Sequence, residues 1–288
     1  MLVLFRDILE SDFVYIFYPT ALRYSIIWCW LLNKPYGVHI RGQQNLTDFY
    51  SRLLYRFSKA TITMADDQTN MIKSINSKNK VYTLERSLVP YSEKDISVGR
   101  TFLKKDKYKI LYLGRIVFDK GIGELINAAY ILNNKYKFDF ELNIYGYGSY
   151  NEEARDLVSN LNLNNKVFFK GPVWNFVEKA EIYRTSDIFI LPSYHEGFPQ
   201  SIHEAMIFGT PIITTFVGSI STLMKDRCNC IRIEPKSVQS IVDALVYTME
   251  NYEEIGKFAQ KAMGDIATFV DSSKLSHADQ LLKCLSNT

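Results

Sequence analysis

Two glutamates, Glu196 and Glu204, give this chain its clearest chemical pattern. Glu196 lies in a loop after an apolar strand predicted at 187–191, and Glu204 lies within a helix predicted at 199–208. The free amides at the start of that helix can bind an anion between the two carboxylates. Carboxylates also accept hydrogen bonds from sugar and ribose hydroxyls. The pattern therefore suits a ligand with a phosphate in its middle and a sugar at each end. In the alternative, Glu204 is only a helix acid favoured by the helix dipole.

A second group of candidate residues follows the strand predicted at 109–112. Gly114 lets the backbone approach a ligand closely, and Arg115 and Lys120 can neutralise a diphosphate beside the next helix start. Gly146 belongs to a Gly-x-Gly turn after the strand predicted at 140–145. Taken alone, these features also fit an ordinary solvated turn, so they gain meaning only together with the glutamates.

Strands and helices must alternate to position these residues. Ile122, Leu125 and Ile126 begin a one-sided apolar stripe typical of a helix, whereas segment 187–191 is a short apolar run typical of a buried strand. The pattern predicts an α/β fold with parallel sheets covered on both faces, in which ligands bind beyond the carboxyl ends of the strands. The expected strands are 13–18, 37–40, 60–64, 80–84, 109–112, 140–145, 166–169, 187–191 and 211–214, and the expected helices are 21–32, 48–58, 67–75, 122–133, 149–161, 175–185, 199–208 and 237–250.

Composition narrows the class of protein. Hydrophobic residues make up 47% and charged residues 23%, as in an ordinary globular chain, and a net charge of +3 is too small to indicate a nucleic-acid binder. The basic excess lies in residues 1–92, which hold 11 Lys and Arg against 7 Asp and Glu. The four cysteines lack the spacing of a zinc site and favour free thiols in a reducing cytoplasm.

Segment 13–32 is apolar over nearly a spanning length, but Pro19 and Arg23 favour a strand, a turn and a helix over a transmembrane span, and residues 1–5 are too short an apolar run for a signal peptide. Two interpretations of its aromatic residues remain open. They belong to the core, or they meet the inner face of a membrane together with nearby cations. The residues concerned are Tyr24, Trp28, Trp30, Tyr36, Arg23, Lys34 and Arg41.

Segment 196–204 resembles the Glu-x7-Glu motif of glycosyltransferase family 4, and segments 114–121 and 187–214 resemble the same family's phosphate-binding and donor-binding parts. The resemblance covers about residues 108–250. It implies a GT-B fold, with two Rossmann-like domains of parallel sheet that face a cleft. It also implies a mostly retaining, metal-independent transferase that needs no cofactor.

The resemblance further implies roles for single residues. Arg115 and Lys120 would hold the diphosphate and stabilise the departing nucleotide, and Glu196 would contact the transferred sugar. Glu204 would contact the ribose. The remaining donor-binding residues would be Gly114, Gly146, Gly197, Phe198, Pro199 and Ser201.

The first third of the chain resembles the later half of a family acceptor domain, so we expect an abbreviated N-terminal domain. His39 and Arg41 are its candidate acceptor-side residues, and His39 has a buried core position as its alternative. Polar residues clustered at 92–107 indicate a linker. We expect an acceptor-side domain at 1–92, a nucleotide-sugar domain at 93–265 and a C-terminal helix at 266–288 that packs back on the first domain.

The sequence thus predicts a hexosyltransferase-type enzyme that moves a sugar from a nucleoside-diphosphate sugar to a glycan or lipid-linked acceptor. Surface polysaccharide or glycoconjugate synthesis is the expected setting. Two alternatives stay open: a donor-binding subunit that needs a partner protein for catalysis, and a nucleotide-sugar epimerase. The expected location is the cytoplasm, with peripheral membrane or protein contact through the N-terminal third.

Overall fold

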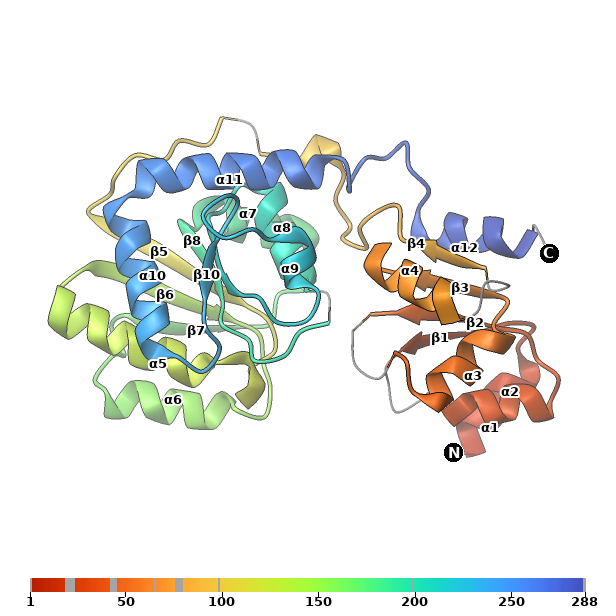
Figure 1. Cartoon of the computed structure of the whole chain (residues 1–288). Helices are drawn as coiled ribbons and strands as arrows, with labels where there is room; N and C mark the ends of the chain where they lie inside the picture. Colours follow the sequence, from red (N-terminus) through yellow and green to blue (C-terminus); the bar gives the residue numbers. More distant parts are fainter. Residues whose placement is uncertain are drawn as a thin grey trace. The chain divides into compact units, whose positions relative to one another are not determined.

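A computed structural model describes residues 2–18, 24–41, 46–64, 66–75, 80–97, 99–197 and 199–286 of the 288-residue chain. The chain divides into two compact units (Figure 1). Unit 1 comprises Met1–Leu88 and Ser272–Thr288, and unit 2 comprises Val89–Asp271. The boundaries expected near residues 92 and 265 refer to domains that fold independently, and they stay predictions.

Unit 1 is a parallel sheet of four strands in the order β1-β2-β3-β4. Its last helix, α12, packs against β3 although it lies more than 200 residues later in the chain. Asp48 begins α3 as expected, since its carboxylate accepts a hydrogen bond from the Ser51 amide at 2.6 Å. The elements are α1 (Leu2–Glu10), β1 (Val14–Tyr18), α2 (Ile26–Leu31), β2 (Tyr36–Ile40), α3 (Phe49–Phe57), β3 (Ala60–Thr63), α4 (Asp66–Ile75), β4 (Val81–Thr83) and α12 (His277–Ser286).

Strand β2 is buried along its whole length, as a central strand of a covered parallel sheet must be. Tyr36, Val38 and Ile40 join the apolar core, while Gly37 and His39 alternate onto the opposite face. Of the four aromatic residues with two open interpretations, Tyr36 is buried and donates to the Leu54 carbonyl at 2.8 Å. Trp28 packs on Phe5. Only Tyr24 and Trp30 are exposed.

Two sequence expectations for unit 1 need correction. Helix α2 covers only Ile26–Leu31 of the expected range 21–32, of which residues 21–23 lie outside the described part of the chain. No element was expected at 2–10, where α1 forms. It buries Ile8 and leaves Leu9 exposed, and so short a one-sided pattern gives too weak a periodicity to predict.

Unit 2 is a parallel sheet of six strands in the order β10-β9-β8-β5-β6-β7. Because β5 pairs with both β6 and β8, the strand order reverses there, and the loops that leave β5 and β8 diverge beyond their carboxyl ends. The strands are β5 (Lys107–Leu113), β6 (Asp139–Tyr145), β7 (Val167–Gly171), β8 (Ile188–Leu191), β9 (Ile212–Thr215) and β10 (Ile231–Ile233).

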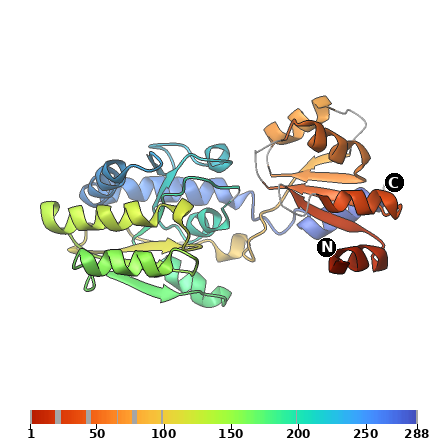
Figure 2. The ribbon, with the colours of Figure 1, turned by 90° about the horizontal axis from the view of Figure 1, so that it is seen from below.

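Helices cover both faces of this sheet (Figures 1 and 2). Helix α5 packs against α6 and α10, and α8 packs against α7 and α11. The predicted α/β class with parallel sheets is confirmed, although β10 and α9 were not expected because each is so short. The helices are α5 (Ile122–Ile131), α6 (Asn151–Asn160), α7 (Phe176–Thr185), α8 (Gln200–Ile207), α9 (Ile220–Leu223), α10 (Val238–Glu250) and α11 (Tyr252–Ala267).

The expected linker at 92–107 packs on unit 2. Phe102 is buried, and its ring lies so close to Gly256 of α11 that a Cβ there would stand 2.5 Å away. Arg100 donates hydrogen bonds to the carbonyls of Tyr183 and Phe208 at the ends of α7 and α8. The polar composition of this segment indicated a linker and did not reveal that the segment packs on unit 2.

Candidate donor site in unit 2

Lys120 and Glu196 meet at the switch point between β5 and β8. Lys120 ends the short turn Phe118–Lys120 before α5, and Glu196 follows β8. The Lys120 Nζ donates to Glu196 Oε1 at 2.6 Å and to the His195 carbonyl at 2.9 Å. The two side chains are only 9% and 12% exposed. Residues predicted from separate motifs thus form one nearly buried ion pair at the strand ends where ligands bind.

Ser193 fixes the orientation of Glu196. Its hydroxyl donates to the same Oε1 at 2.7 Å, and its carbonyl accepts from Thr215 Oγ1 of β9 at 2.8 Å. Within the described part of the chain, Glu196 Oε2 accepts no hydrogen bond. One carboxylate oxygen is therefore held by the protein, and the other can accept a hydrogen bond from a ligand hydroxyl.

The loop that carries Glu196 lies directly on the loop after β9. Gly218 there has φ +61°, and a Cβ on it would stand 1.9 Å from the Glu196 carbonyl oxygen. The Ser219 amide donates to the Gly197 carbonyl at 3.3 Å. Since only glycine fits this contact, Gly218 sets the height of the Glu196 loop above the sheet.

Glu204 lies in a second cluster, on the inner side of α8. Its Oε1 accepts from Lys179 Nζ at 3.1 Å, and its Oε2 accepts from Tyr183 OH at 3.0 Å. Both partners come from α7. The Glu204 side chain is 3% exposed, and burial raises its pKa against the opposing effect of Lys179 and the hydrogen bonds. The two predicted glutamates thus belong to separate clusters. Glu196 pairs with Lys120 after β5, and Glu204 pairs with residues of α7.

A cavity of about 230 Å³ opens at the carboxyl ends of β5, β6 and β7. It brings together three predicted residues, Gly114, Arg115 and Gly146. Gly146 has φ +137°, and a Cβ on it would stand 1.8 Å from the Gly114 carbonyl oxygen, so glycine allows the two loops to touch. The rest of the lining is mostly apolar, from Leu113, Tyr145, Tyr147, Pro172, Val173 and Trp174.

The remaining predicted residues of the site lie around the start of α8. Pro199 precedes the helix as its N-cap, so the expected place in the first turn is wrong by one residue. Ser201 lies in the first turn, and its carbonyl oxygen lies 3.1 Å from Tyr183 OH, whose one proton is shared between this carbonyl and Glu204 Oε2. Phe198 lies outside the described residues. Gly197 lies in the Glu196 loop, where its carbonyl accepts the hydrogen bond from the Ser219 amide.

The two acceptor-side candidates belong to unit 1. Arg41 directly follows β2, is exposed, and lies 5.6 Å from the centre of the Phe17 ring. His39 is fully buried, and its ring lies 4.4 Å from that of His277 on α12. Burial, with smaller effects of His277 and Arg41, lowers the pKa of His39 to about 3. Its side chain is therefore not available to an acceptor in this structure.

Sequence reasoning missed Ser193, Lys179, Tyr183 and the wall of the cavity. Ser193 stands three residues before Glu196, so the motif itself offered a weak signal. Lys179 and Tyr183 stand more than 20 residues before Glu204. Only the packing of α7 on α8 brings them together.

Two features are absent from the described part of the chain. No three His, Cys, Asp or Glu side chains gather there as candidate metal ligands. None of the helices formed by those residues is long and apolar enough to cross a membrane.

Comparison with known proteins adds to this geometry. A family model described as glycosyl transferases group 1 matches residues 93–264. An uncharacterized glycosyltransferase of Methanocaldococcus jannaschii is 32% identical over 150 residues, which are 52% of this chain and 38% of that protein. A putative teichuronic acid biosynthesis glycosyltransferase of Bacillus subtilis is 31% identical over 159 residues, 55% of this chain and 36% of that protein. The chain thus spans well under two thirds of these relatives.

Solved structures share the fold. The Anabaena protein HepE, crystallised with UDP and glucose, aligns with a TM-score of 0.75 at 17% identity over 100% of this chain and 81% of its own. The C-terminal domain of a group 1 glycosyl transferase family protein from Francisella tularensis aligns with a TM-score of 0.52 at 25% identity, over 64% of this chain and 95% of that domain. These likenesses support the two-unit GT-B architecture expected from the sequence.

Proposed function

Because the chain belongs to the glycosyl transferases group 1, we propose that it transfers a sugar from a nucleoside-diphosphate sugar to a glycan or lipid-linked acceptor. The observation that carries this proposal is the Lys120–Glu196 pair at the β5–β8 switch point, with Ser193 as its third member. The pair sets a cation and a carboxylate side by side at the ligand-binding edge of the sheet. A donor bound there would have its diphosphate near the cation and its sugar near the carboxylate.

We assign the parts of the donor along this edge. The apolar cavity between Gly114, Gly146 and Trp174 suits a nucleobase, because flat aromatic walls favour stacking. Arg115, which lines the same cavity, and Lys120, in the turn before α5, suit the diphosphate. Glu196 Oε2 suits a hydroxyl of the transferred sugar. Fold relatives have been crystallised with UDP and with UDP-glucose, which supports a uridine donor as the first one to test.

Glu204 suits the ribose with a restriction that the structure adds. Both of its oxygens are occupied by Lys179 and Tyr183, so a ribose hydroxyl would have to use a remaining lone pair of the same carboxylate. The spacing of Glu196 and Glu204 supports membership of glycosyltransferase family 4 and the Glu-x7-Glu role of the pair.

We further propose a retaining, hexosyltransferase-type reaction that needs no metal. Lys120 and Arg115 would stabilise the charge that develops on the departing nucleoside diphosphate, which is the task a metal ion performs in other transferases. The acceptor hydroxyl would attack on the face of the leaving group, and a phosphate oxygen would take its proton. The four cysteines are free, which fits a cytoplasmic location, and surface polysaccharide or glycoconjugate synthesis is the proposed setting.

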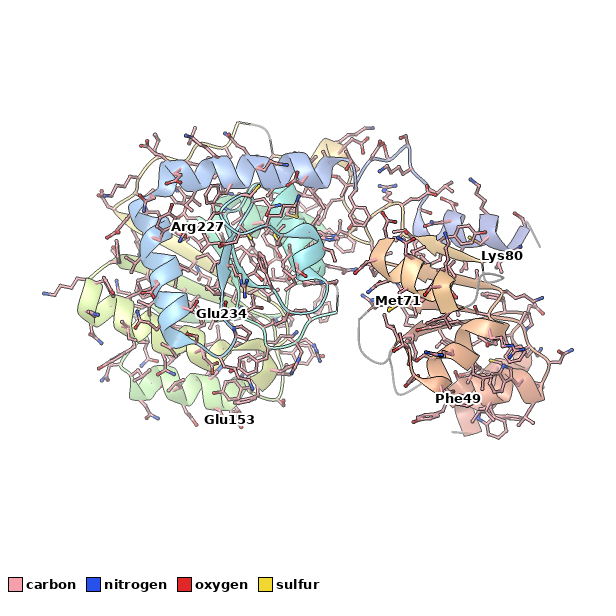
Figure 3. The ribbon with its side chains drawn as sticks, in the orientation of Figure 1. Phe49, Met71, Lys80, Glu153, Arg227 and Glu234 are labelled. Atoms are coloured by element: carbon pink, nitrogen blue, oxygen red, sulfur yellow. The ribbon has the colours of Figure 1, made fainter. Side chains whose placement is uncertain are left out.

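Replacing Glu196 tests this assignment. We expect Glu196→Ala to lower the release of nucleoside diphosphate from the preferred donor by at least roughly a hundredfold, as the loss of one preorganised polar group does in other enzymes. Glu153→Ala on α6 is the matched control, since that glutamate is exposed on an outer helix (Figure 3). Full activity of the Glu196 variant would remove Glu196 from the site.

The main alternative is a donor-binding subunit that needs a partner protein for catalysis. A thermal-shift series with nucleoside diphosphates and their sugars separates the two, because a ligand that binds the native state raises its apparent stability. Stabilisation without turnover, with turnover restored by a second protein, would favour the subunit. Turnover by the purified chain favours the enzyme, and formation of an isomerised donor without acceptor would indicate an epimerase.

A further inference from the structure

Helix α2 turns an apolar side outward from unit 1. Residues 24–32 carry no charged side chain. Tyr24, Ile27 and Leu31 stand three and four positions apart, so they share one side of the helix, and they are 54%, 45% and 69% exposed. An outward helix side in a globular protein normally carries polar or charged residues. Ile27 and Leu31 therefore stand exposed on this side of unit 1.

The apolar side of α2 continues onto α3. The rings of Trp30 and Phe57 meet edge to face with centroids 5.6 Å apart, and those of Tyr24 and Tyr50 lie at the same distance. Phe49, at the start of α3, is 82% exposed (Figure 3). We call this area the α2–α3 surface, defined by its exposed members Tyr24, Ile27, Trp30, Leu31, Phe49 and Phe57. Apolar patches that extend over two elements mark interaction sites more often than chance exposure does.

The segment that carries the α2–α3 surface is basic. Residues 24–59 contain five cations, namely Lys34, Arg41, Arg52, Arg56 and Lys59, and a single acid, Asp48, for a net charge of +4. The Asp48 carboxylate is occupied in capping α3. Arg56 lies 5.8 Å from the centre of the Phe57 ring, so a cation and an exposed aromatic group are direct neighbours. The basic excess in the first third of the chain is thus concentrated beside exposed aromatic residues.

A hollow of about 500 Å³ lies at one end of this surface, where the chain enters β2 and β3. Its lining includes Lys34 and Lys59 together with Trp30 and Phe57. A hollow of about 400 Å³ in unit 2 also has two lysines, Lys104 and Lys257, but these stand beside Glu250, Glu253 and Glu254. The hollow in unit 1 therefore differs from the one in unit 2, because its two lysines stand beside aromatic residues and its lining contains no acid.

From these observations we propose that unit 1 docks on an anionic lipid bilayer through the α2–α3 surface. Tyrosine and tryptophan favour the boundary between acyl chains and headgroups, and the surrounding lysines and arginines are attracted to lipid phosphates. A second copy of the chain fits poorly, because docking would bring +4 against +4. The hollow lies at the amino ends of β2 and β3, and Arg41 follows the opposite end of β2. The proposal does not depend on the donor site.

Co-sedimentation of the full chain with vesicles tests this docking. We expect binding to mixed phosphatidylcholine–phosphatidylglycerol vesicles at low salt, loss of most binding at high salt, and little binding to pure phosphatidylcholine. Leu31→Glu places a charge in the apolar patch and should lower the apparent affinity at least roughly tenfold. Leu282→Glu changes a leucine of similar exposure on α12, the helix that lies on the His39 face of the sheet, and should leave binding unchanged.

A second pair of variants tests the cations at constant charge change. Lys34→Glu with Lys59→Glu should lower the affinity at least roughly tenfold, whereas Lys104→Glu with Lys257→Glu should keep most of it. Circular dichroism establishes that each variant is folded. The proposal is overturned if the wild-type chain does not sediment with anionic vesicles at low salt, or if both pairs lose binding equally. It is also overturned if Leu31→Glu instead dissolves a dimer or a complex with another protein.

Discussion

The Lys120–Glu196 contact places two opposite charges in a nearly buried position at the end of the β5 and β8 strands. In such a place each charge needs the other, because a single buried charge without a partner is far more costly than the pair. The contact also has a consequence for function. A donor diphosphate would compete with Glu196 for Lys120, so the pair would have to loosen when the donor binds.

A double-mutant cycle measures this dependence at the residue scale. We expect Lys120→Met to lower the free energy of unfolding of the unliganded chain by about 3 kcal/mol, because it leaves the Glu196 carboxylate with Ser193 as its remaining partner. In a Glu196→Gln background the same change should cost clearly less, because no unpaired charge remains. Denaturant unfolding gives both values. Equal costs in the two backgrounds would show that the contact contributes nothing specific.

At the scale of elements, the loops beyond the strands decide which side chains meet. The loop after β9 supports the loop after β8 through the contact between Gly218 and the Glu196 carbonyl. Helix α7 supplies Lys179 and Tyr183 to Glu204 on α8. The sheet itself contributes strand ends at fixed spacing, and the glycines let neighbouring loops approach.

Gly218→Ala tests the support of the Glu196 loop. A Cβ at this position would overlap the Glu196 carbonyl and would also require a left-handed backbone, so we expect a loss of at least about 2 kcal/mol in the free energy of unfolding. Activity should fall as Glu196 moves. Gly171→Ala is the control, because Gly171 has φ +79° but no atom within 4 Å of its Cβ position. Similar losses in both variants would mean that backbone strain alone matters.

At the scale of the whole molecule, unit 1 is completed by the C-terminal helix. Glu85 and Thr83 are joined to Gln280 of α12 by hydrogen bonds at 3.3 and 2.7 Å. The His277 ring accepts or donates a hydrogen bond at 2.8 Å with Tyr15 OH and lies on His39. Burial lowers the pKa of His39 and of His277, so both imidazoles stay neutral in the folded unit.

This burial makes the stability of unit 1 depend on pH. The pKa of His39 is about 3 when folded and 6.5 when unfolded. Between these values only the unfolded chain binds the proton, so stability is complete above about pH 6.5 and decreases as the pH falls toward 3. We expect His39 to contribute up to about 1.4 kcal/mol per pH unit in that window.

His39→Phe, measured by denaturant unfolding from pH 7 to 4, should flatten this dependence, since phenylalanine keeps the ring and cannot be protonated. Trp28 and Trp30 report on unit 1 by fluorescence when Trp174 of unit 2 is replaced by Phe. An unchanged slope would show that His39 is not the group that titrates.

Much of this protein could be predicted from the sequence because local physical rules apply. The alternation of apolar runs and one-sided stripes gave the α/β class and most strands. Asp48 marked the start of a helix through capping. The glutamate spacing and the glycines after β5 and β6 identified the edge of the sheet that carries the candidate site.

Only the tertiary structure decided which of these residues meet. Lys120 reaches Glu196 because β5 and β8 are neighbours, although 75 residues separate their loops, and strand order is not written in local periodicity. Lys179 reaches Glu204 only through helix packing, and His39 proved buried because α12 returns to cover it. Short-range patterns thus specify the helices and strands of this chain. The partner of each buried charge is decided in the folded protein, because a charge is buried at acceptable cost only beside an opposite one.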